Sequence, residues 1–319
     1  MTANKVLILV ESYDTLCEAG IKLLKDHGLN VELNLCGRGC KQKKPTGDMA
    51  EVAGVIAGLE SWDKAAMDAY PNLKVIARFG IGYETVDLEE AKRQGIVVTN
   101  CPAKNAAAVA EHAVALLFAA ARQIPCLDER TKNGSWERVM FRELAGKTVG
   151  LLGLGNVGQC FAKMMQGFDC SLLAYNRTPK PEAAKELGIT QVDLEEVLRR
   201  SDYVSLHLAA DDQTKHIINE KTLRLMKKDA VIVNVARGAL VQEAALVDAL
   251  RAGRIGAYAT DVFENEPAEK DDPLLKTRGV ICTPHVAGVT YESYPLIGLT
   301  AAQAIVDVLS KKEPANRIA

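Results

Sequence analysis

The chain has 319 residues, 48% of them hydrophobic and 25% charged, and its 39 basic residues nearly balance 41 acidic ones. The length suggests two domains, and the balanced charge argues against nucleic acid or an anionic membrane as the partner, which leaves a small molecule. Because the apolar run at residues 6–10 is too short for a signal-peptide core or a membrane span, we expect a cytoplasmic protein.

Short runs rich in Val and Ile alternate with helical stretches along the whole chain, which is typical of βαβ units. The alternation occurs twice and predicts an α/β fold with two doubly wound parallel sheets. The first set of expected strands is 6–10, 31–33, 55–57, 75–77 and 97–99. An Ala-rich segment of helical length, 106–122, follows, and we expect it to be buried at a domain junction.

The second set of expected strands is 148–152, 171–175, 203–206, 230–235, 256–260 and 280–282. A helix over 291–311 follows the last of these strands and has no strand of its own to serve, so we expect it to cross back to the first domain. The connections are short, which favours two compact domains with a cleft between them.

A glycine-rich turn, Gly153-Leu-Gly155-Asn156-Val157-Gly158, follows the strand expected at 148–152 and precedes a helical stretch. Strand before and helix after make this spacing informative about dinucleotide binding, although an ordinary tight turn is the alternative. Gly153 would allow the turn, Gly155 the approach of a pyrophosphate, and Gly158 the packing of helix on strand. Free amides and the helix dipole then favour the anion.

Three later strands end in polar residues, at the sheet edge where such folds bind ligands. The segments are Val235-Ala236-Arg237-Gly238, Asp261-Val-Phe-Glu-Asn-Glu266 and Thr-Pro-His285-Val-Ala-Gly288. Taken singly, these groups could be an arginine at a helix start or in a surface salt bridge, an exposed loop carboxylate and a hydrogen-bonded strand-end histidine.

These segments, the glycine turn and Arg78-Phe-Gly80-Ile81-Gly82-Tyr-Glu-Thr-Val-Asp87 closely resemble the D-isomer-specific 2-hydroxyacid dehydrogenases. That family includes phosphoglycerate dehydrogenase and glyoxylate/hydroxypyruvate reductase, and the resemblance extends over almost the whole chain. It implies a Rossmann-type cofactor domain, residues 102–288, inserted in a flavodoxin-like substrate domain of residues 1–101 and 289–319. It also implies a homodimer, with the 106–122 helix and the Trp136 region contributing to the interface.

The resemblance implies a catalytic set of Arg237, Glu266 and His285. A guanidinium can bind the carboxylate of a 2-oxo acid and polarise its carbonyl for hydride attack. Histidine can supply the proton because its unperturbed pKa of about 6.5 permits both protonation states near neutrality. Glu266 would bind the far ring nitrogen of His285 and favour the imidazolium.

Further contacts follow from the same resemblance. Asp261 would accept from the nicotinamide carboxamide, and the substrate carboxylate would be held by amides of Gly80, Ile81 and Gly82. His207 would lie by the cofactor without transferring the proton, and we expect His112 to be packed or interfacial. The expected cofactor-binding residues are Gly153, Gly155, Asn156, Val157, Gly158, Asn176, Arg177, Thr178, Leu208, Val235, Ala236, Asp261 and Gly288.

The position that usually carries an acid for the adenine ribose holds Asn176, followed by Arg177 and Thr178. An aspartate there would repel a 2′-phosphate, whereas Arg177 and the Thr178 hydroxyl can bind one, so we expect NADP to be favoured over NAD. In the alternative, Arg177 points to solvent and Asn176 serves the ribose of NAD.

Two departures from the family pattern bear on function. The turn Gly58-Leu-Glu60-Ser lacks the arginine that related phosphoglycerate dehydrogenases use for a substrate phosphate, and Glu60 would disfavour a phosphate further. The segment His207-Leu-Ala-Ala-Asp211-Asp212 replaces the common His-x-Pro-Leu, which loosens that loop. No regulatory C-terminal domain is expected, because the chain ends soon after the last helix.

We therefore expect an NAD(P)-dependent D-2-hydroxyacid dehydrogenase that reduces a small 2-oxo acid such as glyoxylate or hydroxypyruvate. A D-3-phosphoglycerate dehydrogenase is the enzymatic alternative, and a non-catalytic dinucleotide-sensing protein of the corepressor type is a second one. No metal site is expected. The eight cysteines predict buried thiols rather than disulfides, with Cys36 and Cys40 as two thiols on a Gly-rich loop.

Overall fold

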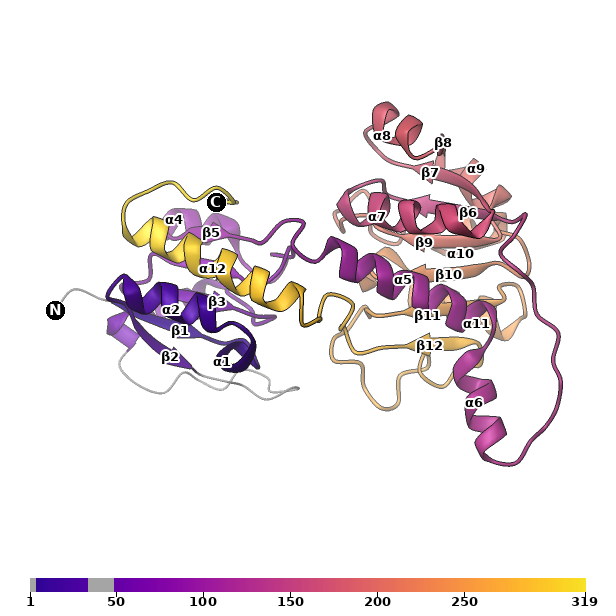
Figure 1. The fold of residues 1–319 in the computed structure, drawn as a ribbon, viewed down its shortest axis with the longest axis horizontal. Coiled ribbons are helices and arrows are strands. Elements are labelled where there is room, and N and C mark those ends of the chain that lie inside the picture. The colour runs from indigo at the N-terminus through magenta and orange to yellow at the C-terminus, as the bar shows by residue number, and fades with distance from the viewer. Residues whose placement is uncertain (1–3, 34–48) are drawn as a thin grey trace. The chain divides into compact units, whose positions relative to one another are not determined.

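A computed structural model describes residues 4–33 and 49–319, which form two compact units (Figure 1). Unit 1 comprises Met1–Asn105 with Val289–Ala319, and unit 2 comprises Ala106–Gly288. The first crossing between units thus lies four residues later than the sequence suggested, and the second lies where we expected it. The prediction for Cys36 and Cys40 concerns residues outside the described part of the chain.

Unit 1 is built on a five-stranded parallel sheet with the order β2-β1-β3-β4-β5. This is the order of flavodoxin-like doubly wound sheets, as the resemblance implied. The central strands β3 and β4 are buried along their whole length, because helices cover both faces of the sheet. The strands are β1 (Lys5–Ile8), β2 (Asn30–Leu33), β3 (Val52–Ala57), β4 (Val75–Arg78) and β5 (Val97–Thr99).

The two faces of this sheet carry separate cores. Val6 and Ile8 of β1 pack in the core that includes residues of α2 and α12, whereas Leu7 points to the opposite core. Helix α12, expected to cross back to the first domain, lies in unit 1 as predicted. The unit's helices are α1 (Tyr13–Leu16), α2 (Glu18–Asp26), η1 (Met49–Glu51), α3 (Lys64–Asp68), α4 (Leu88–Gln94) and α12 (Ser293–Leu309).

Unit 2 is built on a seven-stranded parallel sheet with the order β12-β11-β10-β9-β6-β7-β8. Its first strand is central, and the chain adds β7 and β8 on one side before it returns to add β9 to β12 on the other. The carboxyl edge between β6 and β9 is therefore a topological switch point, where such sheets bind ligands. The strands are β6 (Thr148–Leu152), β7 (Ser171–Tyr175), β8 (Thr190–Gln191), β9 (Tyr203–Leu206), β10 (Val231–Asn234), β11 (Ala257–Thr260) and β12 (Val280–Cys282).

Helix α5 is the most apolar helix of unit 2, and its burial was expected from the sequence. Ala110, Ala113 and Leu117 on it are fully buried, in the core formed with α7 and the sheet. The other helices are α6 (Ile124–Lys132), α7 (Asn156–Met165), η2 (Gln166–Phe168), α8 (Pro181–Glu186), α9 (Leu194–Arg200), α10 (Glu220–Leu225), η3 (Gly238–Leu240) and α11 (Glu243–Arg251), with α5 itself spanning Ala106–Ala121.

No single helix in residues 4–33 and 49–319 is long and apolar enough to span a membrane. Helices α5 and α6 pass a length and apolarity test only when taken together, across a bend of 58°.

All six cysteines in the described part of the chain are free. Only Cys17 and Cys101 of these six are buried, whereas Cys126 and Cys282 are exposed, so the expectation that most of the eight cysteines are buried is wrong.

Candidate active site

The glycine turn after β6 has the geometry that a bound pyrophosphate requires. Gly153 has a φ of 108°, and a Cβ there would lie 2.7 Å from the backbone carbonyl carbon of His207. A Cβ on Gly158 would lie 2.2 Å from the carbonyl oxygen of Gly153, so helix α7 packs directly on the turn. No atom lies within 4 Å of a Cβ on Gly155, the N-cap of α7. The turn therefore leaves open space at the helix N-terminus, which fits a phosphate group.

His207, at the end of β9, is held neutral. Burial lowers the pKa of its imidazole to about 3, and the ring packs on Phe161 with centroids 5.0 Å apart. Neither ring nitrogen has a hydrogen-bond partner within the described residues. The position at the switch point agrees with a place beside the cofactor, while the low pKa prevents His207 from acting as the acid near neutral pH.

The end of β7 is tied to two neighbouring segments. Asn176 Oδ1 accepts from the amide of Leu154 at 2.9 Å, and Nδ2 donates to the carbonyl of Thr178 at 2.5 Å. The guanidinium of Arg177 donates through Nη1 to Oδ2 of Asp211 at 2.7 Å. Asn176 thus braces the glycine turn, and Arg177 is held in an ion pair rather than extending freely into solvent.

Arg237 lies in a turn after β10 that is held from two sides. The side chain of Asn234 accepts from the amide of Ala236 at 3.0 Å and donates to the carbonyl of Arg237 at 2.9 Å. A Cβ on Gly238 would lie 1.9 Å from the carbonyl carbon of Phe263. Glycine is required at this position, because the Arg237 turn packs against the backbone of the loop that carries Glu266.

Glu266 and His285 form a hydrogen-bonded pair. His285 Nδ1 lies 2.6 Å from Oε2 of Glu266, and the amide of Phe263 donates to Oε1 at 3.0 Å. The side chain of His285 is 34% exposed and that of Glu266 is 28% exposed. The bond to Glu266 raises the pKa of His285 against the opposing effect of burial. Burial is the largest single effect and disfavours the charged carboxylate of Glu266. The bond to His285, the charges of His285 and Arg237 and the amide of Phe263 together outweigh it and lower the Glu266 pKa.

Arg237 is close enough to this pair to influence both titrations. After the larger effects of hydrogen bonding and burial, its charge also lowers the pKa of Glu266 and that of His285. The three side chains assigned to catalysis are therefore gathered at one sheet edge. Such an arrangement can bind an anionic carbonyl compound and transfer a proton to it.

Asp261 anchors the loop that carries His285. Its buried carboxylate accepts from the Thr283 hydroxyl at 2.5 Å and from the amides of Val286 and Ala287 at 2.9 and 2.7 Å. His285 itself has a φ of 54°, and its amide donates to the carbonyl of Asp261 at 2.9 Å. A left-handed conformation at a residue other than glycine persists only where its surroundings enforce it. Only one of these side-chain bonds goes to Oδ2, so that oxygen can accept another donor.

Sequence reasoning missed the polar contact between helix α5 and this loop. His112 Nε2 lies 2.9 Å from Oγ1 of Thr283 and 3.6 Å from Oδ1 of Asp261. Because the Thr283 hydroxyl donates to Asp261, it accepts from His112, which places a proton on Nε2 of His112. The position of Thr283 two residues before His285 was the only signal in the sequence.

The remaining predicted cofactor residues lie in the same region of unit 2. Leu208 follows β9, Val235 and Ala236 follow β10, and Gly288 ends the unit shortly after β12. Asn156 and Val157 begin helix α7. Thr178 lies in the turn after β7 and is exposed. Parallel strands bring all these segments to one sheet edge.

In unit 1, the turn Gly80–Gly82 turns its carbonyls toward the protein. The carbonyl of Gly80 accepts from the amide of Cys101 at 2.8 Å. The carbonyl of Ile81 accepts from Nδ2 of Asn100 at 2.9 Å, and that of Gly82 accepts from Nε of Arg78 at 3.1 Å. The amides of Gly80, Ile81 and Gly82 donate to no group within residues 4–33 and 49–319. A turn with bonded carbonyls and free amides is suited to an anion.

Glu60 lies in the turn after β3, next to the β4 strand that leads into Gly80. Ala57 pairs with Arg78 across these two strands, so the turns that follow them are neighbours. Burial raises the pKa of Glu60, opposed in part by backbone amides and by the charge of Arg78. Its Oε2 has no hydrogen-bond partner among the described residues.

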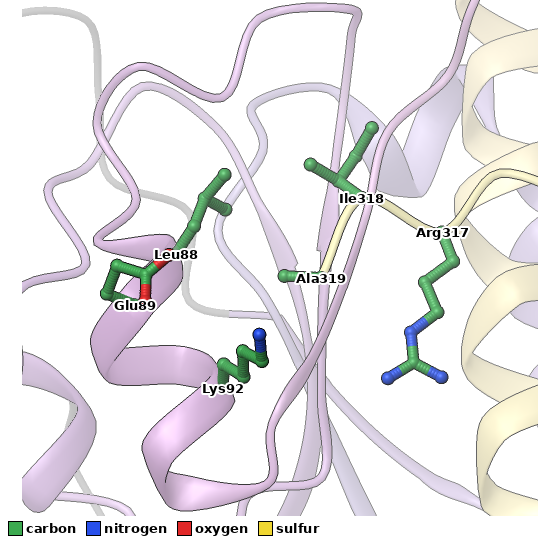
Figure 2. A pocket seen from close by; sticks show the side chains of 6 residues that line it. All are labelled: Leu88, Glu89, Lys92, Arg317, Ile318 and Ala319. Atoms are coloured by element: carbon green, nitrogen blue, oxygen red, sulfur yellow. The ribbon is translucent and has the colours of Figure 1, made fainter.

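Several other features lie outside this site. A surface cavity of about 280 Å³ is lined by Leu88, Glu89, Lys92, Arg317, Ile318 and Ala319, none of them a predicted site residue (Figure 2). His27 bonds a carbonyl of its own helix, and His216 pairs with Glu264 at 2.5 Å. No group of three or more His, Cys, Asp or Glu side chains in the described ranges is placed to hold a metal ion.

Comparisons with known proteins agree with this geometry. Residues 114–287 match the family model described as D-isomer specific 2-hydroxyacid dehydrogenase, NAD binding domain. The chain is 37% identical over 298 residues to a D-3-phosphoglycerate dehydrogenase of Archaeoglobus fulgidus, covering 92% of this chain and 56% of that one. The chain therefore spans little more than half of that relative.

Two further relatives match over more of their own length. A glyoxylate reductase of Thermococcus litoralis is 38% identical over 265 residues, which cover 80% of each protein. The structure of an NADPH-dependent glyoxylate/hydroxypyruvate reductase from Sinorhizobium meliloti, in complex with NADP and malonate, matches with a TM-score of 0.84 at 28% identity. That match covers 99% of this chain and 97% of the other.

Proposed function

This chain belongs to the D-isomer-specific 2-hydroxyacid dehydrogenase family, and on that premise we propose that it reduces a small 2-oxo acid to the D-2-hydroxy acid with a nicotinamide cofactor. The observation that carries the proposal is the His285–Glu266 pair, 2.6 Å apart, within reach of the Arg237 charge. The same sheet edge holds the open glycine turn.

Each catalytic side chain has a definite task in this proposal. The bound nicotinamide supplies the hydride. Arg237 holds the substrate carboxylate and draws electron density from the carbonyl oxygen. His285, protonated on both ring nitrogens, gives its Nε2 proton to that oxygen and is left as neutral imidazole. Glu266 keeps the Nδ1 proton and the ring orientation throughout, because it remains the acceptor of that hydrogen bond.

Other residues would hold the cofactor. The amides at the start of helix α7, around Gly155 and Val157, would bind the pyrophosphate, and the second oxygen of Asp261 would accept from the carboxamide. We propose that NADP is favoured over NAD, because Arg177 can bind a 2′-phosphate and no acid stands at Asn176. The solved reductase of Sinorhizobium meliloti is described as NADPH-dependent, which supports this choice.

For the substrate we propose glyoxylate or hydroxypyruvate, bound through the free amides of Gly80, Ile81 and Gly82. A 3-phosphoglycerate dehydrogenase is the second candidate, favoured by the similarity to the Archaeoglobus fulgidus protein. A phosphate group at the neighbouring turn would meet Glu60 instead of an arginine. Buried carboxylates repel phosphate when ionised, so we prefer the unphosphorylated acids.

We also propose a homodimer formed through unit 2. Apolar side chains are exposed on α6 and the segment that follows it: Ile124 by 53%, Trp136 by 84% and Met140 by 96%. Exposed apolar groups gathered in one segment are typical of protein interfaces. Light scattering of the purified protein gives the molecular mass, and a monomer at micromolar concentration would contradict the proposal.

A panel of 2-oxo acids assayed with NADH and NADPH in parallel tests the function. We expect turnover of glyoxylate and hydroxypyruvate, weaker turnover of phosphohydroxypyruvate, and higher kcat/KM with NADPH. Arg237→Ala and His285→Ala should each reduce kcat/KM by about a hundredfold or more. Turnover that persists unchanged in both variants would refute the mechanism. Absence of turnover in the parent protein would favour the dinucleotide-sensing alternative.

A further inference from the structure

We propose that Asp211 sets how strongly this protein distinguishes NADPH from NADH, by holding Arg177 in an ion pair that a 2′-phosphate must displace. The inference rests on the proposed function in one respect, the role of Arg177 as the ligand of that phosphate. It adds a specificity-determining residue outside the glycine turn and outside the segment 176–178.

The sheet order places this ion pair beside the dinucleotide turn. Arg177 follows β7 and Asp211 follows β9, and these strands lie on the two sides of β6 (Figure 1). The carboxyl end of β6 continues into the turn at Gly153–Gly158. A contact between the loop that follows β7 and the loop that follows β9 must therefore pass across this turn. The adenosine ribose of a dinucleotide lies at the end of the second strand of such a fold, which here is β7.

The two oxygens of Asp211 have different partners. Oδ1 accepts from the amides of Gln213 and Thr214 at 2.9 and 3.0 Å, and from the Thr214 hydroxyl at 3.1 Å. Oδ2 accepts from Nη1 of Arg177 at 2.7 Å. The shape of the loop depends on the first oxygen, and the ion pair depends on the second. A substitution can therefore remove the ion pair without removing the loop.

The ion pair is exposed enough to be displaced. The side chains of Arg177 and Asp211 are 55% and 37% exposed, and ion pairs of this kind are weak because water screens them. A phosphate carries up to two negative charges and several acceptor oxygens, so it can replace one carboxylate on the guanidinium. NADH offers only ribose hydroxyls there and gains nothing from the release of Arg177. Asp211 thus weakens NADPH binding selectively.

The variant Asp211→Asn tests this directly. An asparagine keeps Oδ1 for Gln213 and Thr214, while its amide group places donors against the Arg177 guanidinium in place of Oδ2. The probes are 2′,5′-ADP and 5′-AMP, titrated by calorimetry, so that no oxo acid is needed. We expect binding of 2′,5′-ADP to tighten by about twofold to fivefold, the size of a lost exposed ion pair, and that of 5′-AMP to stay unchanged.

The adjacent Asp212→Asn provides a matched control, because it removes the same charge from the same loop without touching the Arg177 pair. If both variants bound 2′,5′-ADP more tightly by the same factor, the effect would come from net charge alone, and the proposal would be overturned. Weaker binding of 2′,5′-ADP in Asp211→Asn would also overturn it, since Asp211 would then orient Arg177 for the phosphate. Asp211→Ser, whose hydroxyl can accept in the same loop, should reproduce the result of Asp211→Asn and guards against a folding defect.

Arg177→Ala separates this inference from the proposed cofactor preference. If Arg177→Ala leaves the ratio of 2′,5′-ADP to 5′-AMP affinity unchanged, Arg177 is not the phosphate ligand and the cofactor proposal fails. If Arg177→Ala lowers the ratio while Asp211→Asn leaves it at the parent value, only the role of Asp211 fails. In the Arg177→Ala background, Asp211→Asn should have no effect on the ratio.

Discussion

Nδ1 of His285 lies 2.6 Å from Oε2 of Glu266, although the two residues stand on loops that follow different strands. The remaining oxygen of Glu266 is held by the amide of Phe263, and the amide of His285 is held by the carbonyl of Asp261. These backbone bonds hold both partners in place, so the orientation of the imidazole, and with it the direction of Nε2, is fixed. A proton donor oriented in this way needs little reorganisation when it reacts.

Replacing Glu266 by Gln should shift the pH dependence of catalysis. The hydrogen bond to Glu266 raises the pKa of His285 in the folded protein. Reduction requires the imidazolium, so kcat/KM falls as the pH rises through this pKa. In Glu266→Gln the anion is lost and the pKa of His285 falls, so the decline should begin at a lower pH. Profiles of kcat/KM against pH measure the shift.

The oxidation reaction supplies an independent check on that sign. Oxidation requires neutral His285, so its rate rises with pH through the same pKa, and the rise should also move to lower pH in Glu266→Gln. Glu264→Gln serves as the control, because the carboxylate of Glu264 pairs with His216 and not with His285. Superimposable profiles for the parent and Glu266→Gln would contradict the assigned role of Glu266.

The fold could be predicted from the sequence because most of its inner strands are buried on both faces. Such strands appear as continuous apolar runs, and β6, β7 and β9 begin and end where the runs do. Strand β8 was missed. It consists of Thr190 and Gln191 at the sheet edge, and two partly exposed polar residues leave no periodic signal.

The positions of Arg237 and His285 just after strand ends could be predicted from the apolar runs. The bond between Glu266 and His285 was expected only from the resemblance, and other contacts between distant segments were not predictable. The bond between His112 and Thr283 joins residues 171 positions apart, and the Arg177–Asp211 pair joins residues on two loops. Tertiary packing decides such partners, and nothing in local composition marks them. The cytoplasmic location, the homodimer and the cofactor preference stay predictions.

Asn176→Asp should favour NADH over NADPH. The new carboxylate can still accept from the amide of Leu154, as Oδ1 of Asn176 does, so the glycine turn is retained. Its negative charge would face a 2′-phosphate, and repulsion at this range should raise the NADH to NADPH ratio of kcat/KM by about tenfold. Steady-state kinetics with both cofactors measure the ratio. An unchanged ratio would mean that position 176 does not face the ribose.

Gly238→Ala should damage activity more than stability. A Cβ at this position would lie 1.9 Å from the backbone of Phe263, so the turn carrying Arg237 and the loop carrying Glu266 must separate. Overpacking of this kind costs about 1–3 kcal/mol, which most folded proteins survive. Gly167→Ala is the control, since no atom lies within 4 Å of its Cβ. Urea unfolding and kcat are compared, and equal loss in both variants would contradict the argument.

Thr283→Val should weaken the hydrogen bonds by which Asp261 holds the loop that carries His285. Valine has nearly the shape of threonine but lacks the hydroxyl that joins His112 to Asp261. Asp261 then keeps the amides of Val286 and Ala287 but loses one donor while it stays buried. Oδ1 of Asp261 keeps its bond to the amide of Val286, and the loss of the other hydrogen bond costs about 0.5–1.5 kcal/mol, which should appear as a lower free energy of unfolding.

Activity should fall in Thr283→Val as well, because the left-handed conformation of His285 depends on the loop that Asp261 holds. Thr283→Ser keeps the hydroxyl and should restore both stability and kcat to near the parent values. The comparison of these two variants separates the hydrogen bond from the loss of side-chain packing. If Thr283→Ser were as impaired as Thr283→Val, the methyl group and not the hydroxyl would support the loop. The hydrogen bonds that join His112 to Asp261 through Thr283 would then make no contribution to catalysis.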